Sequence, residues 1–282
     1  MPLQIIKRRI KSVTATRQMT KAMQLVASSK LRQAQAALAA PNAYLAAATS
    51  IVEGLEGDSQ ARRHRFYQPP DGHGSLTVVI GGDRGLAGAY NSNLYRQLSQ
   101  AVDGRADDHL VISVGRRAST HLARFANLKL IGAYNMDDDG PVTALAAPIV
   151  SHILSLYDEA AISQVNLVTT KFTSAIKQTT SITQLLPRTP DNTDSDQTDA
   201  VLEPGLVPLL EAAVTRLIEA EVASAIAHAR TSEQAARMMA MMTATDNATD
   251  LVDDLTLELN TVRQAHITQE IAEITTGAAA LT

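Results

Sequence analysis

Both ends of the chain carry long stretches in which almost nothing breaks a helix. From Pro208 there is no further proline or glycine until Gly277, a span of about 70 residues that would measure roughly 105 Å as an α-helix. The stretch from Leu3 to Val52 carries apolar residues at helical spacing, and Pro41 should interrupt it near Ala40. Because globular helices rarely exceed about 25 residues, we expect a coiled coil.

The two stretches carry opposite charge. Residues 1–52 contain eight basic side chains and no acid, whereas residues 203–282 contain four arginines, no lysine and twelve acids. Helices so biased, joined through a middle domain, can lie antiparallel against one another and protrude from that domain as a rod. A rod indicates a mechanical or scaffolding role rather than a pocket.

The expected contact line between the helices is imperfect. Near the carboxy terminus, Leu255, Leu259 and Val262 keep the 4,3 spacing of a coiled coil, but the isoleucines from Ile267 onward start one step out of phase. The amino-terminal stretch is about 20 residues shorter, so the carboxy-terminal end should extend alone for about 30 Å. The apolar positions expected to face inward in the first helix are Ile6, Ile10, Val13, Met19, Met23, Val26, Leu31, Ala34 and Leu38.

Between the helices the pattern becomes alternating α/β. Short β-branched runs predict strands, and amphipathic stretches between them predict helices, so we expect a mostly parallel sheet with right-handed crossovers. The expected strands are Leu76–Ile80, Leu110–Val114, Leu128–Ala133 and Val165–Thr170, followed by an extended stretch over Ser174–Leu186. The expected helices lie near Ser92–Val102, Arg116–Ala126 and Val142–Ala160.

These patterns divide the chain into five segments. They are a coiled-coil helix over 1–55, a linker over 56–74, an α/β domain over 75–190, a polar loop over 191–207, and a coiled-coil helix with its tip over 208–282.

Composition narrows the possible functions. The chain has no cysteine, so it can form no disulfide or thiolate metal site, and its seven histidines show no ligand spacing. No run of eighteen apolar residues predicts a membrane span.

The acid-free start resembles a transit peptide, but its pattern continues through Ser28–Arg32 without a cleavage-like break, so we interpret it as mature structure.

The run Gly81-Gly82-Asp83-Arg84-Gly85 follows a predicted strand and precedes a helix, like a phosphate-binding loop. Its spacing is neither GxGxxG nor a Walker A motif, so a tight strand-to-helix turn is the preferred interpretation. No nucleophile, base and orienting group occur together in a pattern that would support catalysis. We therefore expect no catalytic, cofactor or metal site.

Three groups of motifs resemble the gamma subunit of F-type, proton-translocating ATP synthases. The first comprises Met19-Thr20-Lys21-Ala22-Met23 and Ala27-Ser28-Ser29-Lys30-Leu31-Arg32. The second comprises Asp83-Arg84-Gly85-Leu86 and Asn91-Ser92-Asn93-Leu94. The third comprises Ser232-Glu233-Gln234-Ala235-Ala236-Arg237-Met238, Ala244-Thr245-Asp246-Asn247 and Arg263-Gln264-Ala265-His266-Ile267-Thr268-Gln269-Glu270. The resemblance covers essentially the whole chain.

The resemblance implies the central-stalk rotor of an ATP synthase: an antiparallel coiled coil of the terminal helices with a central Rossmann-like α/β domain. In that family the coiled coil lies inside a ring of three alpha and three beta subunits, and the α/β domain contacts the c-subunit ring and the epsilon subunit. Proton flow turns the c ring and this shaft, and each orientation biases one catalytic beta subunit. The subunit itself would be non-catalytic, without a cofactor.

The resemblance also implies contact residues. Those expected to face the beta subunits are Arg8, Arg9, Lys11, Lys21, Met23, Lys30, Arg263 and Gln264. Glu203 and Pro204 are expected at the foot, against the c ring and epsilon. The apolar tip would turn as a low-adhesion bearing. Met242 stands where the family often has lysine, which removes one charge from the shaft.

Two alternatives from other classes stay open on sequence. One is a dinucleotide-binding α/β enzyme with helical extensions, and the other is a coiled-coil adaptor for nucleic acid or membrane. For the rotor, we expect no nucleic-acid partner, a membrane association only through the c ring, and a peripheral location on the cytoplasmic face of a bacterial plasma membrane.

Overall fold

The computed structural model describes residues 3–58, 60–71, 74–102, 109–125, 128–136, 140–189 and 203–279. Its elements are α1 (Leu3–Ala37), α2 (Ala39–Glu56), the 3-10 helix η1 (Ala61–Arg63), β1 (Ser75–Ile80), α3 (Tyr90–Val102), β2 (His109–Val114), α4 (Arg116–Leu122), β3 (Lys129–Tyr134), α5 (Val142–Asp158), β4 (Gln164–Phe172), β5 (Gln178–Leu186) and α6 (Leu206–Ala279). Two compact units share these elements: residues 1–28 with 237–282, here called the helical unit, and residues 29–236, the sheet unit.

A five-stranded sheet lies at the centre of the sheet unit, in the order β3-β2-β1-β4-β5. β1 runs parallel to β2 and β4, and β2 runs parallel to β3, as the alternating pattern predicts. Only β5 is antiparallel, because the short turn after β4 leaves no room for a crossover helix. Every residue of β1 is buried, as expected for a central strand covered on both faces, and its four apolar residues are Leu76, Val78, Val79 and Ile80.

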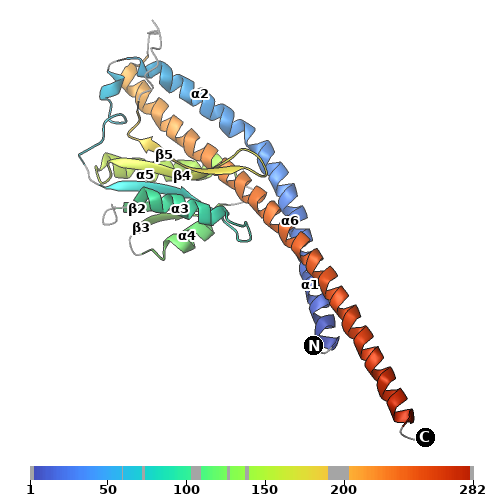
Figure 1. Ribbon diagram of the computed structural model, residues 1–282. Helices are drawn as coiled ribbons and strands as arrows, with labels where there is room; N and C mark the ends of the chain where they lie inside the picture. The colour runs from blue at the N-terminus through green and yellow to red at the C-terminus, as the bar shows by residue number, and fades with distance from the viewer. Residues whose placement is uncertain are drawn as a thin grey trace. The chain divides into compact units, whose positions relative to one another are not determined.

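Helices cover both faces of this sheet (Figure 1). α3 and α4 pack on one face through a small cluster that includes Val79, Leu94 and Leu122. The neighbouring residues Val78 and Ile80 point to the opposite face, where α5, α2 and the first part of α6 build the larger core. The fold is therefore a three-layer α/β sandwich.

The first part of α6 is the central helix of this core. Val214, Leu217, Ile218, Val222 and Ile226 are fully buried on it. α2 lies alongside, where the Ser224 hydroxyl donates to Asn42 Oδ1 at 2.9 Å (Figure 1). α6 begins at Leu206, two residues before the expected Pro208, since proline is tolerated in the first turn of a helix.

The expected interruption near Ala40 is confirmed. α1 ends at Ala37 and α2 begins at Ala39, with only Leu38 between them. Pro41 falls in the first turn of α2, where a backbone N–H has no partner within the helix, so it starts the second helix instead of kinking one long helix.

In the helical unit, α1 and α6 run side by side in opposite directions (Figure 1). The hydroxyl oxygens of Thr20 and Thr245 lie 2.8 Å apart. Buried and half-buried residues recur in strict 4,3 steps on both helices. On α1 they are Ile6, Ile10, Val13, Arg17, Thr20, Gln24 and Ala27, and on α6 they are Met241, Thr245, Ala248, Val252, Leu255, Leu259 and Val262. The antiparallel coiled coil is thus confirmed.

The middle of the expected contact line on α1 is wrong. Met19 is 66% exposed and Val26 is 58% exposed, whereas the polar Arg17, Thr20 and Gln24 face inward. Each of those two apolar residues stands two positions after an inward-facing one, a rotation of about 200° around the helix. The contact line follows the coiled-coil period, and hydrophobicity alone does not reveal it.

The contact line on α6 ends at Val262. Every side chain from Arg263 to Thr276 is exposed, including Ile267, Ile271 and Ile274. The out-of-phase isoleucines therefore mark where pairing stops, and the expectation that α6 extends alone is confirmed up to Thr276. The rest of the expected tip, and residues 190–202 of the expected polar loop, fall outside the described side chains.

Among the described residues, no helix is both long enough and apolar enough to span a membrane.

Candidate functional site

The loop after β1 is held by a carboxylate from α6. Glu233 accepts hydrogen bonds from the backbone N–H groups of Asp83 and Arg84, both at 3.0 Å. Consecutive N–H groups in such a turn form a concave anion site, which in nucleotide-binding proteins takes a phosphate. Here a side chain of the same chain occupies that site, so the tight-turn interpretation of the glycine-rich run is supported.

Two further contacts fix the shape of this loop. Asn91 Oδ1 accepts from the Gly82 N–H at 2.9 Å, which ties the loop to the first turn of α3. Gly115, at the end of β2, has a φ of +103°, and a side chain there would place its Cβ 2.6 Å from the Gly81 carbonyl oxygen. Only glycine lets the two strand ends approach so closely.

Asp83 pairs with Arg116 at the start of α4. Arg116 Nε donates to both carboxylate oxygens, at 3.1 and 3.0 Å, and its backbone N–H donates to Oδ1 at 3.1 Å. Burial acts to raise the pKa of Asp83, but the hydrogen bonds and positive charge of Arg116 outweigh it and hold this pKa below its usual 3.8. Asp83 therefore stays ionised at neutral pH.

The second group of motifs meets the Ser232–Met238 motif of the third group at this place. We call it the α6 joint, and it comprises Glu233, Asp83, Arg84, Asn91 and Arg116. The joint lies where parallel strands end, the edge at which open α/β sheets usually bind ligands. In this chain the edge holds a helix instead. An arrangement of this kind can transmit force between the sheet and α6.

The helical unit presents two kinds of exposed side chain. Of the expected contact residues, Arg8, Arg9, Lys11 and Lys21 are exposed on α1, and Met23 is half-buried. Arg263 and Gln264 are exposed on α6, directly after the contact line ends.

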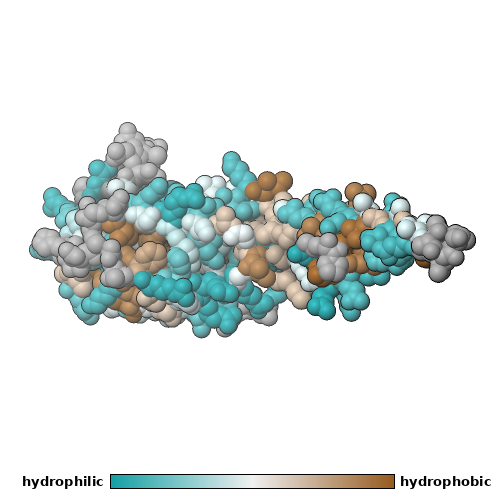
Figure 2. Space-filling view, turned by 60° about the horizontal axis from the view of Figure 1, so that its bottom comes forward, coloured by the Kyte–Doolittle hydropathy of each residue, from teal (hydrophilic) through white to brown (hydrophobic). Residues whose placement is uncertain are grey.

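Exposed apolar residues are the second kind, and the sequence analysis missed most of them. They are Ile5, Met19, Leu25 and Val26 on α1 and Met242, Leu251, Leu257, Ile267, Ile271 and Ile274 on α6. In the space-filling view, hydrophobic residues interrupt the hydrophilic surface (Figure 2). Stepping forward from Ile6 in 4,3 intervals would have identified the four on α1, because that phase excludes them from the contact line.

The expected foot residues belong to the sheet unit. Glu203 and Pro204 are exposed immediately before α6. Lys30, which is expected to contact the beta subunits, also belongs to the sheet unit and is half-buried on α1. Nearby, Glu211 of α6 accepts from Arg65 Nε at 3.1 Å and lies 3.0 Å from His64 Nε2. The hydrogen bond from Arg65 is the main cause that lowers the pKa of Glu211. The start of α6 is thus tied to the segment that follows α2.

A family model described as ATP synthase matches residues 2–281. The chain is 35% identical over 277 residues to the ATP synthase gamma chain of Clostridium novyi (strain NT), covering 98% of this chain and 96% of that protein. It is also 35% identical over 283 residues to the gamma chain of Polaromonas naphthalenivorans (strain CJ2), covering 98% of both.

Solved structures show the same fold. The central stalk of the Tetrahymena thermophila mitochondrial ATP synthase matches with a TM-score of 0.65 and 26% identity, covering 80% of this chain and 99% of that one. A chain of the Euglena gracilis mitochondrial assembly of OSCP, F1 and c-ring matches with a TM-score of 0.67 and 21% identity, covering 99% and 94%.

Proposed function

The chain belongs to the ATP synthase gamma-chain family, whose members are central-stalk subunits, and from this premise we propose that it is the rotor that couples c-ring rotation to ATP synthesis. Its partners are the alpha and beta subunits, the epsilon subunit and the c ring. Proton flow through the membrane turns the c ring, and the coiled coil turns inside the ring of alpha and beta subunits.

Such coupling works as a population shift. A shaft changes the nucleotide affinity of a beta subunit only if it contacts the subunit's alternative conformations differently. The surface of the coiled coil is asymmetric. Basic residues lie on α1, apolar residues lie outside the contact line of both helices, and α6 continues alone past Val262. This unevenness is the observation that carries the proposal.

We assign the exposed Arg8, Arg9, Lys11 and Lys21 to contacts with acidic loops of the beta subunits, with Met23 and Lys30 alongside them. Arg263 and Gln264 make the upper contact, where α6 has left α1. Glu203 and Pro204 contact the c ring and epsilon.

The chain itself is non-catalytic under this proposal, and it binds no cofactor. The Glu233 carboxylate in the loop after β1 supports this view, because it takes the donors that a nucleotide phosphate would need. The alternative of a dinucleotide-binding enzyme thereby loses the feature that suggested it. The bacterial gamma chains among the relatives support a location at the cytoplasmic face of the plasma membrane, peripheral and attached through the c ring.

Charge reversal tests the coupling. Arg8→Glu, Arg9→Glu and Lys11→Glu together should leave the unfolding free energy of the chain within about 1 kcal/mol, since exposed pairs contribute little. ATP synthesis by the assembled complex should fall while assembly persists. Unchanged synthesis would contradict the assignment of these residues.

The upper contact is tested in the same assay. Arg263→Ala with Gln264→Ala should impair assembly or turnover and leave the sheet unit folded, and normal activity of the double variant would remove this assignment. Gln269→Ala, exposed further along α6, is the matched control.

A further inference from the structure

β5 leaves one edge of the sheet open. Its residues Gln178–Gln184 pair in unbroken register with β4, and no other described strand lies beside it. This stretch carries no charged side chain, and its Ile182 is 38% exposed. Its outer edge therefore presents main-chain donors and acceptors beside side chains of high strand propensity.

The opposite edge of the sheet is built differently. β3 has six residues, starts with the exposed Lys129, and its register against β2 shifts between Val111 and Ile112. Short length, charge and irregular pairing are the usual ways in which proteins protect a free edge. β5 has nine residues, and its one irregularity lies at the end, near Leu185. Among the described residues, β3 has these protective features and the stretch Gln178–Gln184 of β5 lacks them.

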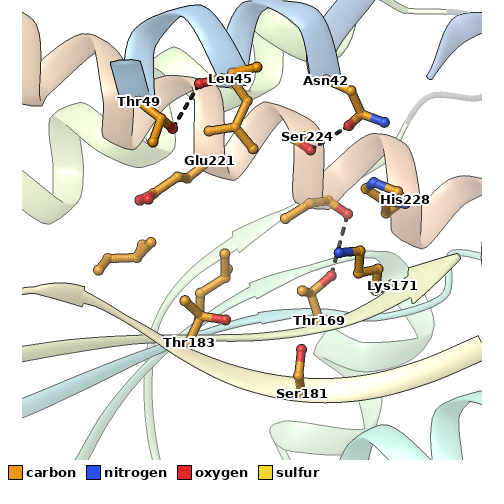
Figure 3. A pocket seen from close by; sticks show the side chains of 14 residues that line it. Asn42, Leu45, Thr49, Thr169, Lys171, Ser181, Thr183, Glu221, Ser224 and His228 are labelled. Carbon is orange, nitrogen blue, oxygen red and sulfur yellow. Dashed lines mark hydrogen bonds between the residues drawn. The ribbon is translucent and has the colours of Figure 1, made fainter. Parts of the chain in front are cut away.

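A cleft of about 530 Å³ adjoins β5. β4 and β5 form its floor, and α2 and α6 form its roof (Figure 3). Hydroxyl groups of Thr169, Ser181 and Thr183 line the floor. Lys171 and His228 lie at one end of the cleft, and Glu221 lies toward the other (Figure 3). Side chains of a strand placed beside β5 would have a largely apolar space to enter, with hydroxyl groups on its floor.

The charge near β5 indicates what kind of segment could pair with its outer edge. From Lys171 to Thr189 the chain contains Lys171, Lys177 and Arg188 and no acid, and both lysines are exposed. Arg188 is paired with Glu221 at 3.0 Å, so the lysines dominate the field near β5. An acidic segment is attracted to them. A second copy of β5 carries no acid between Lys171 and Thr189, so it offers the lysines no opposite charge.

We propose that the outer edge of β5 accepts an extended, acidic segment of another protein subunit as a sixth strand of the sheet. Main-chain hydrogen bonds to β5 supply affinity, and the cleft and the two lysines supply selectivity. The shaft contacts proposed above do not use this edge, so the inference stands or falls separately from them.

Hydrogen exchange tests the occupancy of the edge. The full-length chain is measured alone and within the intact complex purified through a tag on this chain. The amides of Gln178–Gln184 that point away from β4, which are every second one, should exchange at least roughly tenfold more slowly in the complex, whereas those of β3 should change little. Equal exchange of β5 in both samples would overturn the proposal.

Cross-linking identifies the occupant. Because the chain has no cysteine, Thr183→Cys can carry a single photoreactive maleimide, and Ala133→Cys on β3 is the matched control. The Thr183 position should cross-link to an acidic segment of another subunit, and the Ala133 position should not. A link to a second copy, or to residues 190–202 of the same chain, would overturn the proposal.

Charge reversal completes the test. Lys171→Glu with Lys177→Glu should lower the cross-linking yield roughly fivefold, as expected for the loss of two exposed charge contacts. Lys129→Glu on β3 should leave the yield unchanged. Equal yields from the three proteins would refute the acidic nature of the segment.

Discussion

At the scale of single residues, Glu233 joins α6 to the loop after β1. Its carboxylate is buried and accepts two backbone N–H groups at 3.0 Å. Glu233→Ala leaves both N–H groups without the carboxylate, so we expect a loss of about 2–3 kcal/mol in unfolding free energy, measured by urea denaturation. Glu219→Ala, which removes only a surface pair on the same helix, should change it by less than about 1 kcal/mol. Equal effects would show that the joint has no special role.

Asp83 gives a pH-dependent prediction. Its pKa lies below 3.8 in the folded chain, so its ion pair with Arg116 stabilises the fold fully above that pH and is lost as the pH falls through the folded pKa. Asp83→Asn should cost about 1–2 kcal/mol at pH 7, and the difference from the parent chain should shrink below about pH 3.8. A difference independent of pH would contradict this account. The exposed Asp246→Asn serves as the control.

Residue contacts of this kind were the hardest to predict from the sequence. Glu233 and Asp83 stand 150 positions apart, and no local pattern indicates that they touch. The sequence indicated a tight, glycine-rich turn between a strand and a helix, but it could not show that a side chain of α6 binds its backbone N–H groups.

At the scale of elements, the polar middle of the coiled coil specifies register. Thr20 and Thr245 face each other across the contact line, with Arg17 and Gln24 nearby on α1. Polar groups at such positions fix alignment at the expense of stability. Thr20→Val with Thr245→Val should therefore leave the unfolding free energy unchanged or raise it by about 1 kcal/mol.

A double-mutant cycle over the two threonines measures this. The losses of unfolding free energy in the two single variants should sum to more than the change in the double variant. Each single variant leaves one hydroxyl facing a methyl group, whereas the double variant does not. Thr261→Val, exposed on α6, is the control and should have little effect. A double variant destabilised by more than about 1 kcal/mol would show that the threonine pair stabilises the coiled coil.

The helices and strands were easier to predict from the sequence than the side of each helix that faces its neighbour. The absence of helix breakers after Pro208 predicted α6, and β-branched runs ending in glycine predicted β1 and β2. The inward face of α1 could not be read from hydrophobicity, because Met19 and Val26 point outward while polar residues face α6.

At the scale of the whole molecule, we expect the exposed apolar residues of the coiled coil to contact other subunits and to contribute little to the stability of this chain. Leu25→Ser with Val26→Ser removes exposed side chains, so the unfolding free energy should change by less than about 1 kcal/mol. ATP turnover by the assembled complex should fall roughly fivefold or more, because each lost apolar contact is worth about 1 kcal/mol. Gln18→Ser, exposed on the same helix, should leave turnover unchanged.

The central claim is that this chain turns within its complex and that the turning drives the catalytic subunits. A fluorescent probe on a single introduced cysteine, Ala89→Cys, can report its orientation in one surface-held complex, since the chain has no other thiol. Under ATP hydrolysis the probe should rotate in one direction and pause three times in each turn, once for each beta subunit. A complex that hydrolyses ATP at its normal rate while the probe stays fixed would contradict the account.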